Sequence, residues 1–261
     1  MSDKTPEVKI TLQPDGVVAP ILNALKECSQ TVLLGHKAVE NLSTMPETNL
    51  ENEIFFKLEF PYDAFDEQKK KYKEWLITRG FQDLVEGMKL SLIEAYRYLS
   101  VFEWFGGTSQ QKKTTVEEVN KYFDELRKDS AKQQLPGLLD KVRPLGQLQY
   151  EKHILSLNRA RRCLVHRNGI VTPEDVNTPE NTLKIIWIRY FLFYESDDGE
   201  EELVKNHRMK KSAAVMLKIK QEEKAFQLGE KITFTYKEFY EFMTTFHHFA
   251  IDIGSKLPKI K

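Results

Sequence analysis

The stretch Leu183–Tyr194, with the sequence LKIIWIRYFLFY, separates two kinds of sequence within this chain. It is dense in β-branched and aromatic residues, which favour extended strands. Most of the chain before it instead repeats apolar residues every three or four positions, as amphipathic helices do. We therefore expect a mainly helical fold, with a small antiparallel β-hairpin or sheet inserted before the last helix.

Upstream of this stretch, the spacing of apolar residues predicts two long helical segments. The first covers about Val18–Leu42 and is followed by an irregular connection over Ser43–Asp66, which contains two prolines. The second pattern runs from Phe81 to Phe102. Gly80 predicts a break or kink before it, and Gly106-Gly107 predict its end.

Capping signals mark the next helices. Thr115, followed three residues later by Glu118, predicts a capping box and a helix start. A short helical piece with Pro136 and Gly137 comes next, and then a helix from about Leu148 to Arg167. Gly169 lies where a helix C-terminal glycine is expected.

Downstream of Tyr194, two more strand-like segments lie at Ala213–Lys220 and Lys231–Tyr236, around the charged stretch Gln221–Lys224. The acidic stretch Glu195–Glu202, which contains an Asp-Asp-Gly turn sequence, is expected to be an exposed turn. A helix from about Lys237 to Ser255 is predicted to close the chain.

These segments predict a division of the chain near residue 66. Residues 1–66 form an N-terminal helix and connection that pack on the main domain. Residues 67–261 form that helical domain, with the β insertion at about 183–236. The chain has 261 residues, 41% hydrophobic and 11% aromatic, which is typical of a folded protein with a substantial core. Its formal net charge is zero, so any binding of a polyanion has to be local.

The composition also predicts the compartment and excludes several kinds of site. No apolar run has the length of a membrane span and no signal-peptide pattern opens the chain, so we expect a cytoplasmic protein without membrane contact. Cys28 and Cys163 fall in apolar helical patterns, which favours reduced, packed thiols. His247 and His248 point about 100° apart on a helix and have no obvious third ligand, so no metal site is predicted. No phosphate-binding or dinucleotide-binding glycine pattern is present, and no cofactor is expected.

The candidate functional residues lie in Leu155–Val171, with the sequence LSLNRARRCLVHRNGIV. A helical wheel places Arg161 near the centre of an apolar face. The other members of that face are Tyr150, Ile154, Leu157, Leu164 and Val165. A guanidinium in that place is costly to bury unless it is paired. Two interpretations remain open: a structural arginine paired with a buried carboxylate, or an arginine held at an interface to bind a phosphate.

The opposite side of the same helix carries Arg159, Arg162 and His166. The simplest interpretation is a solvated basic face near a helix C-terminus, where positive charge is favourable. Arg161 and His166 are five residues apart and so about 140° apart around a straight helix. They can share one site only if the helix unwinds before Gly169 or if two protomers each contribute side chains.

The segment Arg161–Val171 (RRCLVHRNGIV) resembles the signature of HEPN domains, the higher-eukaryote-and-prokaryote nucleotide-binding family. The common pattern of that family is Arg-Asn, three residues and His, often followed by a Gly-Ile/Val-Val tail. Helices before the motif and a β-hairpin after it agree with the family, as does Leu228–Thr235 (LGEKITFT) leading into a last helix. The resemblance covers about Glu67–Ser255, of which only the short motif is specific. Where the family usually has asparagine, this chain has Arg162.

The resemblance implies a metal-independent endoribonuclease that acts as a homodimer on RNA, single-stranded where it binds. His166 is implied as general base or acid on the ribose 2′-hydroxyl, and Arg161 as the group that holds the phosphate. The residues implied for substrate binding are Asn158, Arg159, Arg162 and Arg167. A role as a toxin or defence effector, with a cognate antitoxin or inhibitor, is also implied.

Two alternatives stay open because of Arg162. One is a non-catalytic dimer of the same fold that binds nucleotide, RNA or a protein partner. The other is a helical interaction protein in which Arg161 only satisfies a buried acid. The family resemblance therefore sets an expectation about the fold more firmly than an expectation about catalysis.

Overall fold

The protein was analysed as a computed structural model, which describes residues 12–44, 65–105, 115–196, 199–203 and 214–259. Within these ranges the fold is mainly helical, with a small antiparallel sheet before the C-terminal helix, as the sequence predicts. The helices are α1 (Pro14–Asn41), α2 (Phe65–Trp104), α3 (Val116–Lys132), α4 (Leu135–Lys141), η1 (Arg143–Leu145), α5 (Glu151–His166) and α6 (Tyr236–Lys256). The strands are β1 (Thr182–Ser196), β2 (Gly199–Glu202) and β3 (Val215–Gln227).

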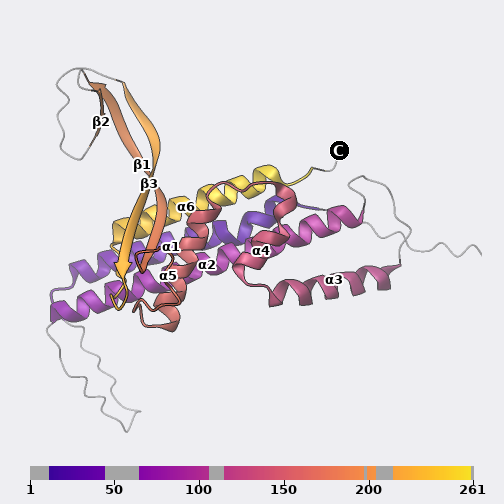
Figure 1. Ribbon diagram of the computed structural model, residues 1–261, viewed down its shortest axis with the longest axis horizontal. Coiled ribbons are helices and arrows are strands. Elements are labelled where there is room, and N and C mark those ends of the chain that lie inside the picture. The colour runs from indigo at the N-terminus through magenta and orange to yellow at the C-terminus, as the bar shows by residue number, and fades with distance from the viewer. Residues whose placement is uncertain (1–11, 45–64, 106–114, 197–198, 204–213, 260–261) are drawn as a thin grey trace, which may run out of the picture.

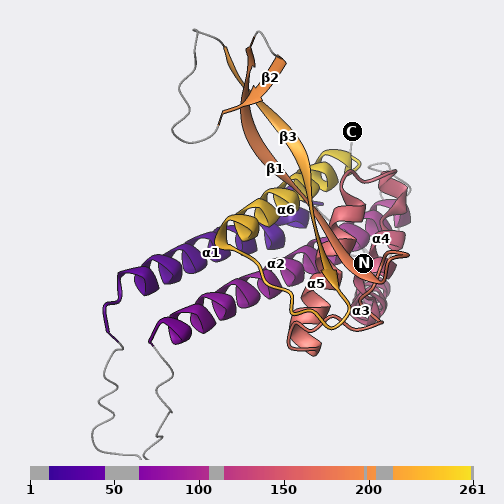
Figure 2. The same cartoon turned by 60° about the vertical axis from the view of Figure 1, so that its left-hand side comes forward.

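The body of the molecule is a layer of three long helices, α1, α2 and α6, which lie side by side in both views (Figure 1, Figure 2). Helix α6 supplies a row of buried phenylalanines at three- and four-residue spacing, including Phe239, Phe242, Phe246 and Phe249. Helices α1 and α2 bury the apolar residues that the spacing predicted, such as Ile21 and Leu84. One continuous core therefore joins the first helix to the last.

Helix α2 is longer than predicted, because Gly80 neither breaks nor ends it. Gly80 is buried at the point where α2 meets both α1 and α6. A Cβ atom there would lie 2.8 Å from Cγ2 of Val32 and 2.8 Å from Cζ of Phe239. The prediction of a break was wrong because this glycine provides room for close helix packing. The predicted end at Gly106-Gly107 and most of the connection Ser43–Asp66 lie outside the described residues.

This packing predicts opposite effects for the same substitution at two helical glycines. Gly80→Ala gains helix propensity but forces Val32 and Phe239 apart, so we expect the free energy of unfolding to fall by about 1–3 kcal/mol. Gly16→Ala, in α1, meets no atom within 4 Å, so we expect a rise of about 0.5–1 kcal/mol. Urea unfolding followed by circular dichroism measures both values. A stabilised Gly80→Ala variant would show that the helices do not pack this closely.

One end of α2 is covered by α3 and α4. The predicted capping box is confirmed: the Glu118 amide donates to the Thr115 hydroxyl, and the Thr115 amide donates to the Glu118 carboxylate. The Tyr96 hydroxyl of α2 donates to Asp129 of α3 at 2.8 Å, and Lys141 of α4 pairs with the same carboxylate at 3.1 Å. These contacts hold α3 and α4 against α2, and the chain then turns at η1 before α5 begins.

The three strands form an antiparallel sheet of order β2-β1-β3, and its long hairpin rises away from the helical layer (Figure 1, Figure 2). Strand β1 pairs with β3 from Thr182 opposite Gln227 to Tyr194 opposite Val215. The predicted first strand is therefore confirmed, although it is slightly longer than Leu183–Tyr194. Along the uncovered edge of β1, side-chain hydroxyls take the place of a further strand: the Ile186 amide donates to Ser156 of α5, and the Ile188 amide donates to Thr245 of α6.

Three predictions about the β segment were wrong. The charged stretch Gln221–Lys224 continues strand β3 and is not a connection. The stretch Lys231–Tyr236 is not a strand, since only Lys231 makes an isolated bridge, opposite Ile170. Part of the acidic stretch Glu195–Glu202, predicted to be a turn, forms strand β2 and the end of β1. For the first and third of these the physical reason is charge pairing, because glutamates of β3 and β2 face a basic partner on β1.

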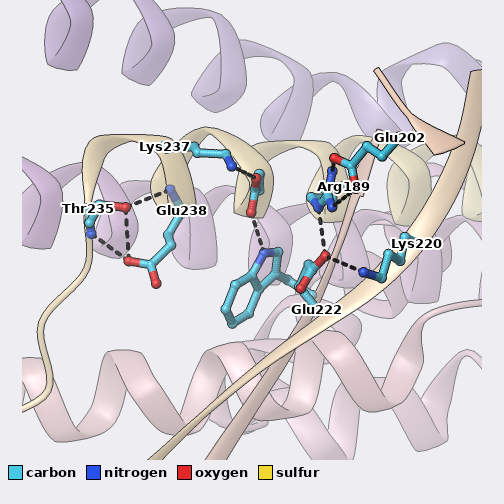
Figure 3. A network of polar contacts seen from close by, with 9 residues as sticks. Arg189, Glu202, Lys220, Glu222, Thr235, Lys237 and Glu238 are labelled. Carbon is cyan, nitrogen blue, oxygen red and sulfur yellow. Dashed lines mark hydrogen bonds and ion pairs between the residues drawn. The ribbon is translucent and has the colours of Figure 1, made fainter. Parts of the chain in front are cut away.

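That partner is Arg189 of β1, whose guanidinium lies between Glu202 of β2 and Glu222 of β3 (Figure 3). The distances are 2.6 Å from its Nε to Glu222 and 2.8 and 2.9 Å from its Nη atoms to Glu202. The indole N–H of Trp187, on the same face of β1, donates to Glu241 of α6 at 2.8 Å. This polar face therefore ties the three strands to each other and to α6.

Both cysteines are buried, and neither forms a disulfide, as the sequence predicts. Burial raises the pKa of Cys28 and that of Cys163 to about 12, so both remain thiols at neutral pH. No helix in the described ranges has the length and apolar character needed to cross a membrane.

Candidate functional site

Helix α5, which carries the candidate residues, packs against β1, α2 and α6. Its buried residues are Ile154, Ser156, Leu157, Ala160 and Cys163. Leu164 and Val165, expected on the buried face, are only half-buried, and Tyr150 lies before the helix with a left-handed φ of 65°. The centre of the buried face therefore runs along Leu157 and Ala160. Arg161 lies at its edge and not at its centre.

Arg161 is half-buried and has no paired carboxylate among the described residues. Its Nε atom is buried without a hydrogen-bond partner. A buried guanidinium N–H without an acceptor is costly, and such groups are uncommon in folded proteins. The interpretation of Arg161 as one half of a buried ion pair therefore has no support in the described part of the chain.

The outer face of α5 is basic. Arg159, Arg162 and His166 are exposed, Asn158 is half-buried, and none of the four has a hydrogen bond or ion pair within the described residues. At 100° per residue, His166 lies about 20° from Arg159 and about 40° from Arg162 around the axis. The rise of 1.5 Å per residue separates Arg159 and His166 by about 10 Å along the helix. These three side chains form one strip, which we call the basic strip.

Arg167, the fourth predicted binding residue, is held by acidic neighbours. Its guanidinium pairs with Asp175 at 2.8 Å and also with Glu174. Asp175 is 2% exposed and also accepts from the amide and the hydroxyl of Thr172, at 3.0 and 2.9 Å. The charge of Arg167 is therefore largely balanced, and the residue fixes the loop after α5.

Helix α5 is regular through His166, so it does not unwind between Arg161 and His166. The chain leaves the helix only afterwards, with left-handed Asn168 (φ 52°) and Gly169 (φ 77°). Gly169 is thus the helix-terminating glycine that the sequence predicts. The carbonyl of Gly169 accepts from the Ile232 amide at 2.8 Å, which anchors this turn to the segment before α6. The separation of about 140° between Arg161 and His166 within one chain therefore stands.

Sequence reasoning missed a second group of titratable side chains, at the other end of α5. His248 was considered only as a metal ligand and His153 was given no functional role, but both contact the β-hairpin. No sequence pattern links them, because they come from α5 and α6, which are far apart in the sequence. Tyr190 and Gln221 lie on the same face of the hairpin, which becomes apparent only once the pairing register of β1 and β3 is known.

The arrangement at the end of α5 can bind an anion but does not place a complete acid–base pair around one phosphate in a single chain. The basic strip offers two free guanidinium groups and one imidazole, and Arg161 adds a third guanidinium at the edge of the buried face. Guanidinium groups bind phosphate oxygens in a bidentate manner, and imidazole transfers protons near neutral pH. Comparisons with protein-family models, with curated proteins and with solved structures give no match to this chain.

Proposed function

We propose that this chain is a metal-independent endoribonuclease of the HEPN type that acts as a homodimer. The observation that carries the proposal is the basic strip together with Arg161: four side chains able to bind or protonate a phosphodiester, none neutralised by a described acidic residue. The mainly helical fold, with its hairpin between the motif helix and the last helix, agrees with the family that the motif resembles.

In this proposal, His166 takes a proton from the ribose 2′-hydroxyl, and the resulting oxygen attacks the adjacent phosphorus. The bond from phosphorus to the 5′-oxygen breaks, and a proton is delivered to that leaving oxygen. Arg161 binds the non-bridging phosphate oxygens and stabilises the charge that develops on them. Because Arg161 and His166 of one chain point about 140° apart, the site combines the Arg161 of one protomer with the His166 of its partner. The protonated His166 then gives its proton to the leaving 5′-oxygen, so the same imidazole serves first as base and then as acid.

A second candidate function is RNA binding without cleavage. It is favoured by Arg162, which is exposed on the basic strip where the family usually has asparagine. The guanidinium of Arg162 adds a positive charge beside His166 and so strengthens phosphate binding. It does not replace the asparagine amide if that amide orients a catalytic pair. Both candidates place RNA on the same strip and differ only in what happens to the phosphodiester.

The test compares wild type with His166→Ala on total RNA in the presence of EDTA. Cleavage by wild type, lost by a factor of about 10²–10⁴ in the variant, is the expected result for a general acid–base residue. His247→Ala is the matched control, since it removes an exposed imidazole from α6 and leaves α5 unchanged. Equal RNA profiles for wild type and His166→Ala would contradict cleavage by this site, and retained binding would then support the second candidate.

Light scattering after size exclusion tests the dimer directly. A mass of twice 30.6 kDa is expected. A strict monomer that nevertheless cleaves RNA would contradict a site shared between two protomers. Loss of cleavage on adding EDTA would contradict the metal-independent mechanism.

A further inference from the structure

A cluster of histidine and tyrosine side chains joins the β-hairpin to the helices on the face opposite to Arg189. Nε2 of His153, on α5, lies 3.0 Å from Oε1 of Gln221 on β3. Nε2 of His248, on α6, shares a hydrogen bond with the hydroxyl of Tyr190 on β1. The ring of Tyr150 packs edge-on against both imidazoles, with centroids 5.3 Å from His153 and 5.9 Å from His248. We call these five residues the histidine cluster.

The surroundings of His153 favour the neutral imidazole. Its Nε2–H donates to the Gln221 carbonyl oxygen, which leaves Nδ1 as an acceptor. Nδ1 is buried and has no hydrogen-bond partner in the described structure. A second proton would have to sit on Nδ1 as a buried, charged N–H without an acceptor, which is strongly unfavourable. Burial accordingly lowers the pKa of His153, against a smaller opposing effect of the Gln221 hydrogen bond.

His248 is in a similar position. Burial lowers its pKa, and the neighbouring His247 lowers it further. Protonation of both His153 and His248 would place two positive charges on either side of one tyrosine ring. Each charge would be more costly in the presence of the other.

Among the charged or titratable groups on the elements that form the cluster are Lys152, next to His153 on α5, His247 and Asp252 on α6, and the ion-paired Lys184 of β1 and Glu223 of β3. The two carboxylates are already occupied. Asp252 accepts from the Gln149 amide at 2.7 Å and pairs with Lys256 at 2.9 Å. Glu223 pairs with Lys184 at 2.6 Å. Neither is therefore free to stabilise a protonated His153 or His248.

The polar face of the same hairpin responds differently to acid. The hydrogen bonds from Arg189 hold the pKa of Glu202 below its usual value, so this carboxylate stays ionised in mildly acidic solution. Arg189 remains charged at every relevant pH. The Arg189 face of the hairpin is thus held together by groups whose charge persists in mild acid, whereas the opposite face meets α5 and α6 through two imidazoles, whose charge changes on protonation.

We propose that the histidine cluster is an acid-sensitive attachment, and that protonation of His153 and His248 releases this face of the hairpin from α5 and α6. The attachment is complete above about pH 6.5, the ordinary value for histidine, and weakens as the pH falls below it. The direction of this pH dependence follows from the lowered pKa of both imidazoles in the attached state, since the released state then binds protons more readily than the attached state. The hairpin remains tethered to α6 through the hydrogen bond from Trp187 to Glu241 while its contact with α5 opens.

Hydrogen exchange of backbone amides tests the proposal, with rates expressed as protection factors so that the intrinsic effect of pH cancels. Between pH 7.5 and 5.5, we expect protection of the Ile186 amide, which donates to Ser156 of α5, to fall by about tenfold or more relative to the amides of α1 and α2. The double variant His153→Gln, His248→Gln keeps neutral hydrogen-bonding groups at both positions and is expected to lose this pH dependence. His36→Gln, on α1 and away from the cluster, is the control in which it is retained.

Two results would overturn the proposal. The first is a wild-type hairpin whose protection relative to α1 and α2 is the same at both pH values, a measurement that needs no variant to fold. The second is a double variant with the pH dependence of wild type. Neither depends on RNA cleavage, so the proposal can fail or succeed independently of the proposed function.

Discussion

Asp175→Ala is expected to lower the free energy of unfolding by about 3–5 kcal/mol, because it leaves the Arg167 guanidinium beside an empty, buried site. The lost carboxylate is 2% exposed and accepts from Arg167 on one side and from both the amide and the hydroxyl of Thr172 on the other. It also interacts with the thiol of Cys163 within α5. A single side chain thus connects the last turns of α5 to the loop that follows.

The size of this effect can be separated from a general effect of substitution in the loop. Glu174→Ala removes the other carboxylate that contacts Arg167, but the Glu174 side chain is 73% exposed, so we expect a loss below about 1 kcal/mol. Asp175→Asn keeps an acceptor for Thr172 and removes the charge, so its loss should lie between those of the two alanine variants. Urea unfolding at pH 7 measures all three. Equal losses for Asp175→Ala and Glu174→Ala would contradict a buried structural role for Asp175.

Helices with regular apolar spacing were predictable from the sequence, because burial on one face leaves a periodic pattern. Helix α6 begins one residue before the predicted Lys237 and ends one residue after Ser255. The capping box at Thr115 was predictable because it is purely local. Gly80 was not, since its role depends on Val32 and Phe239, which are distant in the sequence.

The strands differ in the same way, since β1 was predictable from its own composition and β3 depends on residues distant in the sequence. Strand β1 has an apolar and aromatic composition that favours an extended conformation by itself. Strand β3 is largely exposed and carries charges, and it is a strand because β1 pairs with it along its whole length. Its glutamates and lysines signal a strand only when the position of Arg189 across the sheet is known.

The candidate site was predictable as a list of residues but not as an arrangement. The sequence places Arg159, Arg162 and His166 on one face of α5, and that face is exposed. Arg167 belongs to the same run, yet Glu174 and Asp175, seven and eight residues later in the loop, bind it. The lack of a partner for the buried Nε of Arg161 among the described residues could not be predicted, because burial at a helix edge depends on which elements pack there.

Arg161→Met is expected to separate a functional arginine from a structural one, because the two roles predict opposite effects on stability. Methionine fills similar space and removes a buried N–H that has no acceptor in the described structure, so we expect the free energy of unfolding to rise by about 1 kcal/mol. A structural arginine with paired charges would instead lose stability on this substitution. Unfolding in urea distinguishes the two signs.

The same variant is expected to lose RNA cleavage by about 10²–10³-fold, the usual cost of removing one group that stabilises developing charge on a phosphate or oxyanion. Arg159→Met is the matched control. It lies on the basic strip, is exposed and unpaired among the described residues, and should change stability by less than about 0.5 kcal/mol. It should weaken RNA binding mainly at low salt, reducing the dependence of log K on log salt by about one. If Arg161→Met is more stable than wild type but inactive, the wild type is less stable than it could be because it keeps a guanidinium available to bind phosphate. A variant that is less stable and fully active would assign Arg161 to the core.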